Sequence, residues 1–116
     1  MNKLSCVLIV CLSLLSLTSQ AVTVTTNKGP ITRLYAYDDY GKVEGKDGAA
    51  VFIYMNTGVS ACPASIYMSP RAPGYKNLVS FVLAAYMAGK QVSFQVYDDV
   101  SRQLDGRCEV DAIRLD

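Results

Sequence analysis

The stretch from Tyr75 to Gly89, YKNLVSFVLAAYMAG, decides how this chain folds, because it is the one segment that clearly predicts a helix. Apolar residues recur at the spacing that places side chains on one face of an α-helix. A second face is apolar as well, and the polar residues are confined to the first part of the segment. Gly89 can adopt the positive φ that often ends a helix. A helix that is apolar nearly all round needs cover on two sides, so the segment predicts contact with a sheet and with a neighbouring subunit.

Short strands are predicted before this helix. Ile31–Tyr37 follows a Gly-Pro pair, and Ala49–Met55 is a short apolar run that we expect to be covered on both faces. Between them lies a polar segment that closes with Asp47-Gly48, a hairpin signal, so the two strands should pair antiparallel. Cys62–Met68 predicts a third strand, with Pro63 restricting it to an edge or a strand start.

Two further strands are predicted after the helix. Gln91–Tyr97 alternates between apolar and polar residues, which predicts one buried and one outward face. The inward set is Val92, Phe94 and Val96, and the outward set is Ser93, Gln95 and Tyr97. In Cys108–Leu115 the apolar alternation slips by one residue, which predicts a β-bulge near Asp111 or Ala112.

This order of elements predicts a mainly β fold. Strands grouped before and after a single helix argue against a parallel sheet with crossover helices. A small antiparallel barrel of about five strands fits better, and the OB-fold, with its helix between the third and fourth strands, has this order. The prediction is one OB-like β-barrel domain over residues 22–116.

The N-terminal 21 residues predict a secretory signal peptide. Lys3 is followed by an apolar run and by a small-residue site that ends at Ala21. The alternative is a membrane anchor, but the run is shorter than the ~20 apolar residues that a spanning helix needs. The expected location is therefore the periplasm or the outside of the cell, and no membrane span is predicted.

Two cysteines, Cys62 and Cys108, remain after such a cleavage. In an exported chain a disulfide between them is the favoured interpretation, and two free thiols are the alternative. The bridge would close a loop of about 47 residues, which is worth roughly 4 kcal/mol in the chain-entropy model.

Composition excludes several function classes. Beyond residue 21 the chain has ten basic and ten acidic residues, dispersed among one another, so no nucleic-acid binding is expected. The chain contains no histidine, which removes Ser-His-Asp and Cys-His catalysis and the usual zinc sites. We therefore predict no enzyme activity, no catalytic residue, no metal and no cofactor. A small hydrolase would need two carboxylates converging in a pocket, and no motif indicates them.

The segment CPASIYMSPRAPGYKNLVSFVLAAYMAGKQVSFQVYDD, followed by GRCEVDAIRL, resembles a family of small secreted bacterial proteins related to the B subunits of pentameric toxins. The subtilase cytotoxin B subunit is one example. The resemblance covers Cys62–Leu115, and no glycan-contacting motif of the family is matched. It implies an OB-fold, assembly as a pentamer with helices around a central pore, and binding of host glycans.

Two predicted strands end with the same pattern, a tyrosine followed by two aspartates. These six residues are the predicted ligand-binding residues. These are Tyr37, Asp38 and Asp39, and Tyr97, Asp98 and Asp99. If the two strand ends lie side by side, their four carboxylates could hold a calcium ion. They could also accept hydrogen bonds from sugar hydroxyls beside a stacking tyrosine. The alternative is that the Asp-Asp pairs simply solvate turns. Among the other tyrosines, Tyr35, Tyr40 and Tyr75 are candidates for exposed contacts.

The function predicted from the sequence is a secreted or periplasmic binding module that resembles a toxin B subunit and binds a glycan or a protein as a homo-oligomer. The predicted subunit interface consists of helix residues, namely Leu78, Phe81, Val82, Ala85 and Tyr86. The alternative is a monomeric structural or inhibitory envelope protein, whose helix is covered by its own loops.

Overall fold

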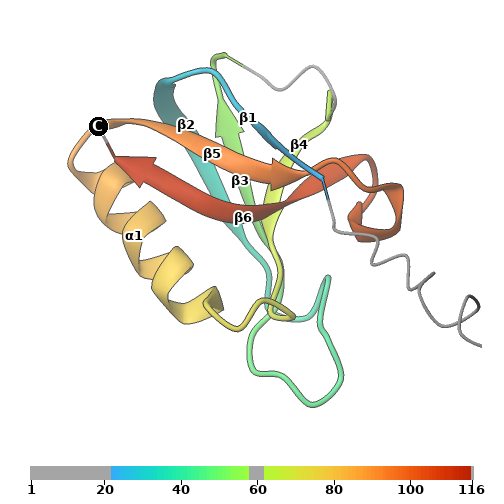
Figure 1. Ribbon diagram of the computed structural model, residues 1–116. Coiled ribbons are helices and arrows are strands. Elements are labelled where there is room, and N and C mark those ends of the chain that lie inside the picture. Colours follow the sequence, from blue (N-terminus) through green and yellow to red (C-terminus); the bar gives the residue numbers. More distant parts are fainter. Residues whose placement is uncertain (1–21, 58–61, 116) are drawn as a thin grey trace, which may run out of the picture.

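Five strands close into a barrel in the order β2, β3, β4, β6, β5 and back to β2 (Figure 1). The computed structural model describes residues 22–57 and 62–115. Its elements are β1 (Thr23–Thr25), β2 (Gly29–Ala36), β3 (Val51–Met55), β4 (Ser65–Met68), helix α1 (Tyr75–Met87), β5 (Gln91–Tyr97), the 3₁₀ turn η2 (Val100–Arg102) and β6 (Arg107–Leu115). Strands β4 and β6 are parallel, and every other paired couple is antiparallel. The predicted fold class, a mainly β, OB-like barrel with one helix, is confirmed.

The position of the helix differs from the prediction in one detail. The residues before β2 form a separate short strand, β1, which pairs with β5 through Thr23 and Tyr97. Helix α1 therefore follows the fourth strand of the chain rather than the third. Because β1 and β2 both lie along the same edge of β5, they act together as the first strand of the barrel.

Strand pairing follows the predicted hairpin and bulge. Leu34 of β2 lies opposite Ile53 of β3, in an antiparallel ladder. On β6 the register jumps, since Gln95 pairs with Ala112 while Val96 pairs with Val110. Asp111 is thus the extra residue of a bulge, as the slipped alternation predicts.

The predicted faces of β5 are confirmed apart from one residue. Val92, Phe94 and Val96 are fully buried in the barrel core. Ser93, predicted to face outward, is also buried. Both edges of β5 are paired, and a short serine side chain between larger neighbours on such a strand is easily shielded from water.

A disulfide joins Cys62 to Cys108, with 5.7 Å between their Cα atoms, as predicted. Both residues are buried, and the bridge ties the segment before β4 to strand β6. Both cysteines belong to the main core, together with Phe94 and Ile53. The bridge therefore reinforces the parallel β4–β6 ladder that closes the barrel.

Helix α1 lies across the barrel and buries one face. Val82 and Ala85 are buried in the core, and Leu78 packs against it, so these three predicted interface residues contact the chain's own barrel instead. Phe81 and Tyr86 remain exposed, at 54% and 39%. The amphipathic stripe thus serves the core, as in most surface helices. Gly89 ends the helix with φ +64°, as predicted.

No helix in the described part of the chain is both long and apolar enough to cross a membrane. The predicted signal peptide, residues 1–21, lies outside the described residues.

Candidate functional site

The two predicted Tyr-Asp-Asp segments make different contacts in the structure. Tyr37 packs its ring on Phe52 at 4.8 Å, whereas the Tyr97 hydroxyl donates to Asp111 at 2.7 Å. Among residues 22–57 and 62–115, no three acidic or cysteine side chains converge as metal ligands would. The structure therefore gives no support to a shared calcium site.

The predicted aspartates have local roles. Asp39 faces the amino group of Lys42 at 3.7 Å on the surface. Asp99 caps η2, because its carboxylate accepts hydrogen bonds from the hydroxyl and the backbone N–H of Ser101 at 2.8 and 3.0 Å. These two bonds lower the pKa of Asp99. The backbone N–H of Asp98 donates to Val22, so this residue anchors the chain before β1.

An aromatic cluster covers the outer side of β3, and Tyr37 is part of it. Phe52 points away from the barrel core, into a second apolar cluster with Ala50 and Tyr67. The ring of Tyr40 lies 5.2 Å from that of Tyr37 and 5.9 Å from that of Phe52. We call the surface formed by Tyr37, Tyr40, Phe52, Asp105 and Arg107 the aromatic face.

The aromatic face surrounds a hollow of about 270 Å³ lined by its five residues. Two loops form its walls, the β2–β3 loop and the loop between β5 and β6. The second loop ends in a tight turn at Asp105-Gly106, where both residues have positive φ, +49° and +76°. Reciprocal backbone hydrogen bonds of 3.0 Å between Leu104 and Arg107 close this turn. The turn places Asp105 and Arg107 at the hollow.

Arg107 is held against aromatic rings. Its guanidinium carbon lies 4.0 Å from the centre of the Phe52 ring. A hydrogen bond with Arg107 lowers the pKa of Tyr54, on the same outer side of β3. The Nε atom of Arg107 is buried and has no hydrogen-bond partner among the described residues. Its Nη1 atom donates to the Asp105 carbonyl at 3.4 Å. A half-buried guanidinium that lines the hollow among aromatic rings is suited to a ligand that brings acceptor oxygens.

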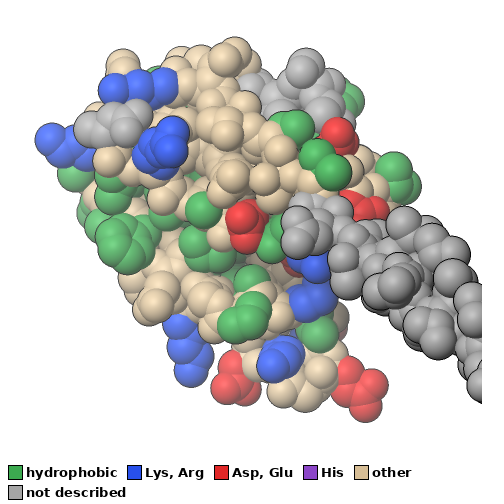
Figure 2. All heavy atoms as spheres, in the orientation of Figure 1, with side chains coloured by type: hydrophobic (Ala, Val, Ile, Leu, Met, Phe, Trp, Pro, Cys, Tyr) green, Lys and Arg blue, Asp and Glu red, His purple; other side chains and the backbone are tan. Residues whose placement is uncertain are grey.

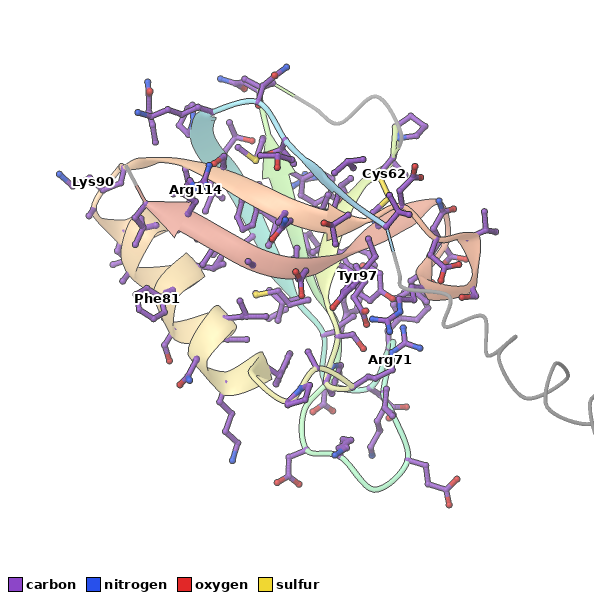
Figure 3. All side chains as sticks on the ribbon, in the orientation of Figure 1. Cys62, Arg71, Phe81, Lys90, Tyr97 and Arg114 are labelled. Atoms are coloured by element: carbon purple, nitrogen blue, oxygen red, sulfur yellow. A yellow bond between two sulfur atoms is a disulfide. The ribbon has the colours of Figure 1, made fainter. Side chains whose placement is uncertain are left out.

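A larger groove, of about 700 Å³, lies between α1 and β6. Figure 3 shows Phe81 midway along α1, Arg71 in the segment before the helix and Tyr97 at the end of β5. The apolar part of its lining consists mainly of Leu78, Phe81, Val110, Ile113 and Leu115. We call this the α1–β6 groove.

A charged network closes the end of the α1–β6 groove near the start of the helix. Glu109 is 1% exposed, and its Oε1 accepts hydrogen bonds from the Nε and Nη2 atoms of Arg71 at 3.1 and 3.0 Å. Its Oε2 accepts one from Nη1 of Arg102 at 3.2 Å. Arg102 also lies over the ring of Tyr97 at 4.1 Å, which links the network to Asp111.

The network shifts the ionisation of its members in consistent directions. The hydrogen bond to Glu109 raises the pKa of Arg71, because the carboxylate stabilises the charged guanidinium. The hydrogen bond to Asp111, aided by burial, raises the pKa of Tyr97. Burial, with the nearby Glu109 charge, raises the pKa of Tyr67, whose hydroxyl donates to the Arg102 carbonyl at 2.8 Å.

Of the aromatic face, the sequence predicts only Tyr37 as a ligand-binding residue, and Tyr40 as a candidate for an exposed contact. Asp105-Gly106 is a hairpin signal of the same kind as Asp47-Gly48, and it could have located the turn that presents Arg107. Phe52 stands in a continuous apolar run whose faces sequence alone does not separate.

Comparison with known proteins adds no relative to this description. No family model matches the chain, and no curated protein and no solved structure matches it significantly.

Proposed function

We propose that this protein is an exported, non-enzymatic binding module, similar to toxin B subunits, that binds glycans at its aromatic face. The observation that carries the proposal is the hollow between the two loops, lined by Tyr37, Tyr40 and Phe52 with Asp105 and Arg107. OB-folds bind oligosaccharides and oligonucleotides on this side of the barrel, between the corresponding loops. The balanced and dispersed charge of the chain disfavours an oligonucleotide.

The chemistry of the aromatic face suits a sugar. The apolar face of a pyranose ring can pack on tyrosine rings, and Tyr40 is 39% exposed and thus accessible. Sugar hydroxyls can accept hydrogen bonds from Arg107 and donate to the Asp105 carboxylate. The small volume of the hollow favours the end of a glycan over an internal stretch.

Export is supported by two features of the chain. One is the disulfide between Cys62 and Cys108, a bond typical of oxidising compartments. The other is the sequence pattern of residues 1–21, which is typical of a signal peptide.

The proposed binding can be tested with Tyr40→Ala. We expect the variant to bind an immobilised glycan panel about tenfold more weakly than the wild type, because a stacked ring is worth roughly 1 kcal/mol or more. Arg107→Ala should lose at least as much affinity, because it removes the hydrogen-bond donor that lines the hollow. Affinities measured by calorimetry with the best oligosaccharide of the panel would check both.

Arg114→Ala provides a matched control for Arg107→Ala, because Arg114 is an exposed arginine of the same strand, outside the hollow. It should bind like the wild type. Equal binding by Tyr40→Ala and wild type, or no glycan bound by the wild type, would contradict the proposal.

Self-association would give such a module avidity for clustered glycans. The support is on α1, where three exposed apolar side chains lie outside the α1–β6 groove: Leu83, Tyr86 and Met87. By resemblance to toxin B subunits, we expect light scattering to give about five times the monomer mass. Met87→Asp, at a side chain that is 77% exposed, should lower that mass without loss of fold. A monomeric wild type would refute the assembly but leave the aromatic face intact.

A further inference from the structure

Strand β6 has an open edge. It pairs with β4 only over Arg107–Glu109, and the rest of its ladder is formed with β5 on the other side. Strand β4 ends at Met68, and the chain then turns away toward the helix. Across residues 22–57 and 62–115, no strand continues the place of β4 beside Val110–Leu115.

The open edge presents unpaired backbone groups at defined residues. The N–H of Phe94 donates to the Thr26 hydroxyl at 2.9 Å, and its carbonyl accepts from the Thr26 N–H at 2.8 Å. Both groups of Phe94 therefore point away from β6. Ile113 lies opposite Phe94, and in such a non-hydrogen-bonded pair the groups of both residues point outward. The N–H and carbonyl of Ile113 thus face the open edge, and by alternation those of Leu115 do as well.

The α1–β6 groove runs along this edge. Ile113 and Leu115 line it from the strand, and Phe81 lines it from the helix. Apolar side chains are visible on this face of the molecule, over α1 and β6 (Figure 2). An added strand would find backbone partners on one side and apolar contacts for every second side chain on the other.

The charged end of the groove offers more hydrogen-bond donors than acceptors. Both carboxylate oxygens of Glu109 already accept bonds from arginines. The Nε and Nη2 atoms of Arg71 donate hydrogen bonds to Glu109, whereas its Nη1 atom does not. The Arg71 side chain is 46% exposed. The carboxylate of Asp111 already accepts the Tyr97 hydroxyl. Two arginines and two carboxylates balance the charge of this end, and the exposed guanidinium of Arg71 keeps a donor for a further acceptor oxygen.

We propose that the α1–β6 groove binds an extended peptide segment as an added strand antiparallel to β6, with its C-terminal carboxylate at Arg71. The antiparallel direction follows from the position of Arg71 near Glu109, where the open edge begins and an antiparallel strand would end. The edge from Val110 to Leu115 accommodates about five or six residues at roughly 3.4 Å each. Unpaired backbone groups select a peptide over a lipid, because an acyl chain would leave them unsatisfied. The inference uses a different surface from the aromatic face and does not depend on glycan binding.

The test uses a labelled hexapeptide of alternating threonine and valine with a free C-terminal carboxylate, titrated with the purified protein by fluorescence anisotropy. We expect saturable binding, and about tenfold weaker binding of the C-terminally amidated peptide, which lacks the charge that pairs with Arg71. Two N-methylated peptides, modified at odd or at even positions, separate the two edges of the added strand. One pattern should abolish binding and the other should leave it nearly unchanged, because alternate N–H groups face β6.

Phe81→Asp, at a half-exposed residue that the core does not need, should weaken peptide binding at least about tenfold through loss of the apolar wall. Val100→Asp is the control, since Val100 is 81% exposed and lies outside the groove. Equal binding of all four peptides, or no binding, would overturn the proposal. So would a wild-type multimer that Phe81→Asp converts to a monomer without either form taking up peptide, because the groove would then be an interface between copies.

Discussion

Replacing Cys62 and Cys108 together by alanine is expected to lower the free energy of unfolding by about 4 kcal/mol, the loop-closure value for a bridge of this span. The two residues are 46 positions apart, so the bridge restricts a large part of the unfolded chain. It also ties the segment before β4 to β6, across the parallel ladder that closes the barrel. Chemical denaturation of both proteins without reductant would measure the difference.

The double substitution avoids a complication of single variants, which leave one buried thiol free to form intermolecular bridges. A control is the wild type in reductant, which should approach the stability of the double variant. Identical denaturation midpoints for the oxidised wild type and the variant would show that the bridge contributes nothing to stability.

Glu109→Ala should cost about 3 kcal/mol of stability, at the lower end for breaking a buried ion pair, because both arginine partners are partly exposed and can turn to water. Glu109 is 1% exposed and organises Arg71 and Arg102 around its carboxylate. Without it, the loop before α1 and the turn η2 lose their common anchor. Thermal and chemical denaturation would measure the loss.

Glu109→Gln should cost less, because the amide oxygen can still accept a bond from one arginine. Glu44→Ala, at the exposed glutamate of the β2–β3 loop, should change stability by less than about 0.5 kcal/mol. If Glu109→Ala were as stable as Glu44→Ala, the network would have no structural importance.

Local patterns in the sequence predicted much of the fold. The alternation in Gln91–Tyr97 predicted β5 with its bounds, and the phase slip in the last strand located the bulge at Asp111. Each pattern depends only on residues near one another in the chain. The disulfide was predictable because only two cysteines follow the apolar N-terminal run.

The site was less predictable because it depends on contacts between distant segments. Glu109 stands in a strand as an ordinary charged residue, and its burial depends on Arg71, 38 positions earlier, which lies in a proline-rich loop. The aromatic face forms only when the barrel brings Phe52 next to Arg107. The helix shows a related limit, since its pattern did not separate core residues such as Val82 from exposed ones such as Phe81.

The most direct test of glycan binding at the aromatic face is a ¹⁵N–¹H NMR titration of the protein with the oligosaccharide that binds best in the panel. We predict saturable shifts centred on Tyr37, Tyr40 and the Asp105–Arg107 turn, with the amides of α1 unchanged. Shifts that centre on other parts of the barrel, or no shifts at millimolar oligosaccharide, would contradict this function for the aromatic face.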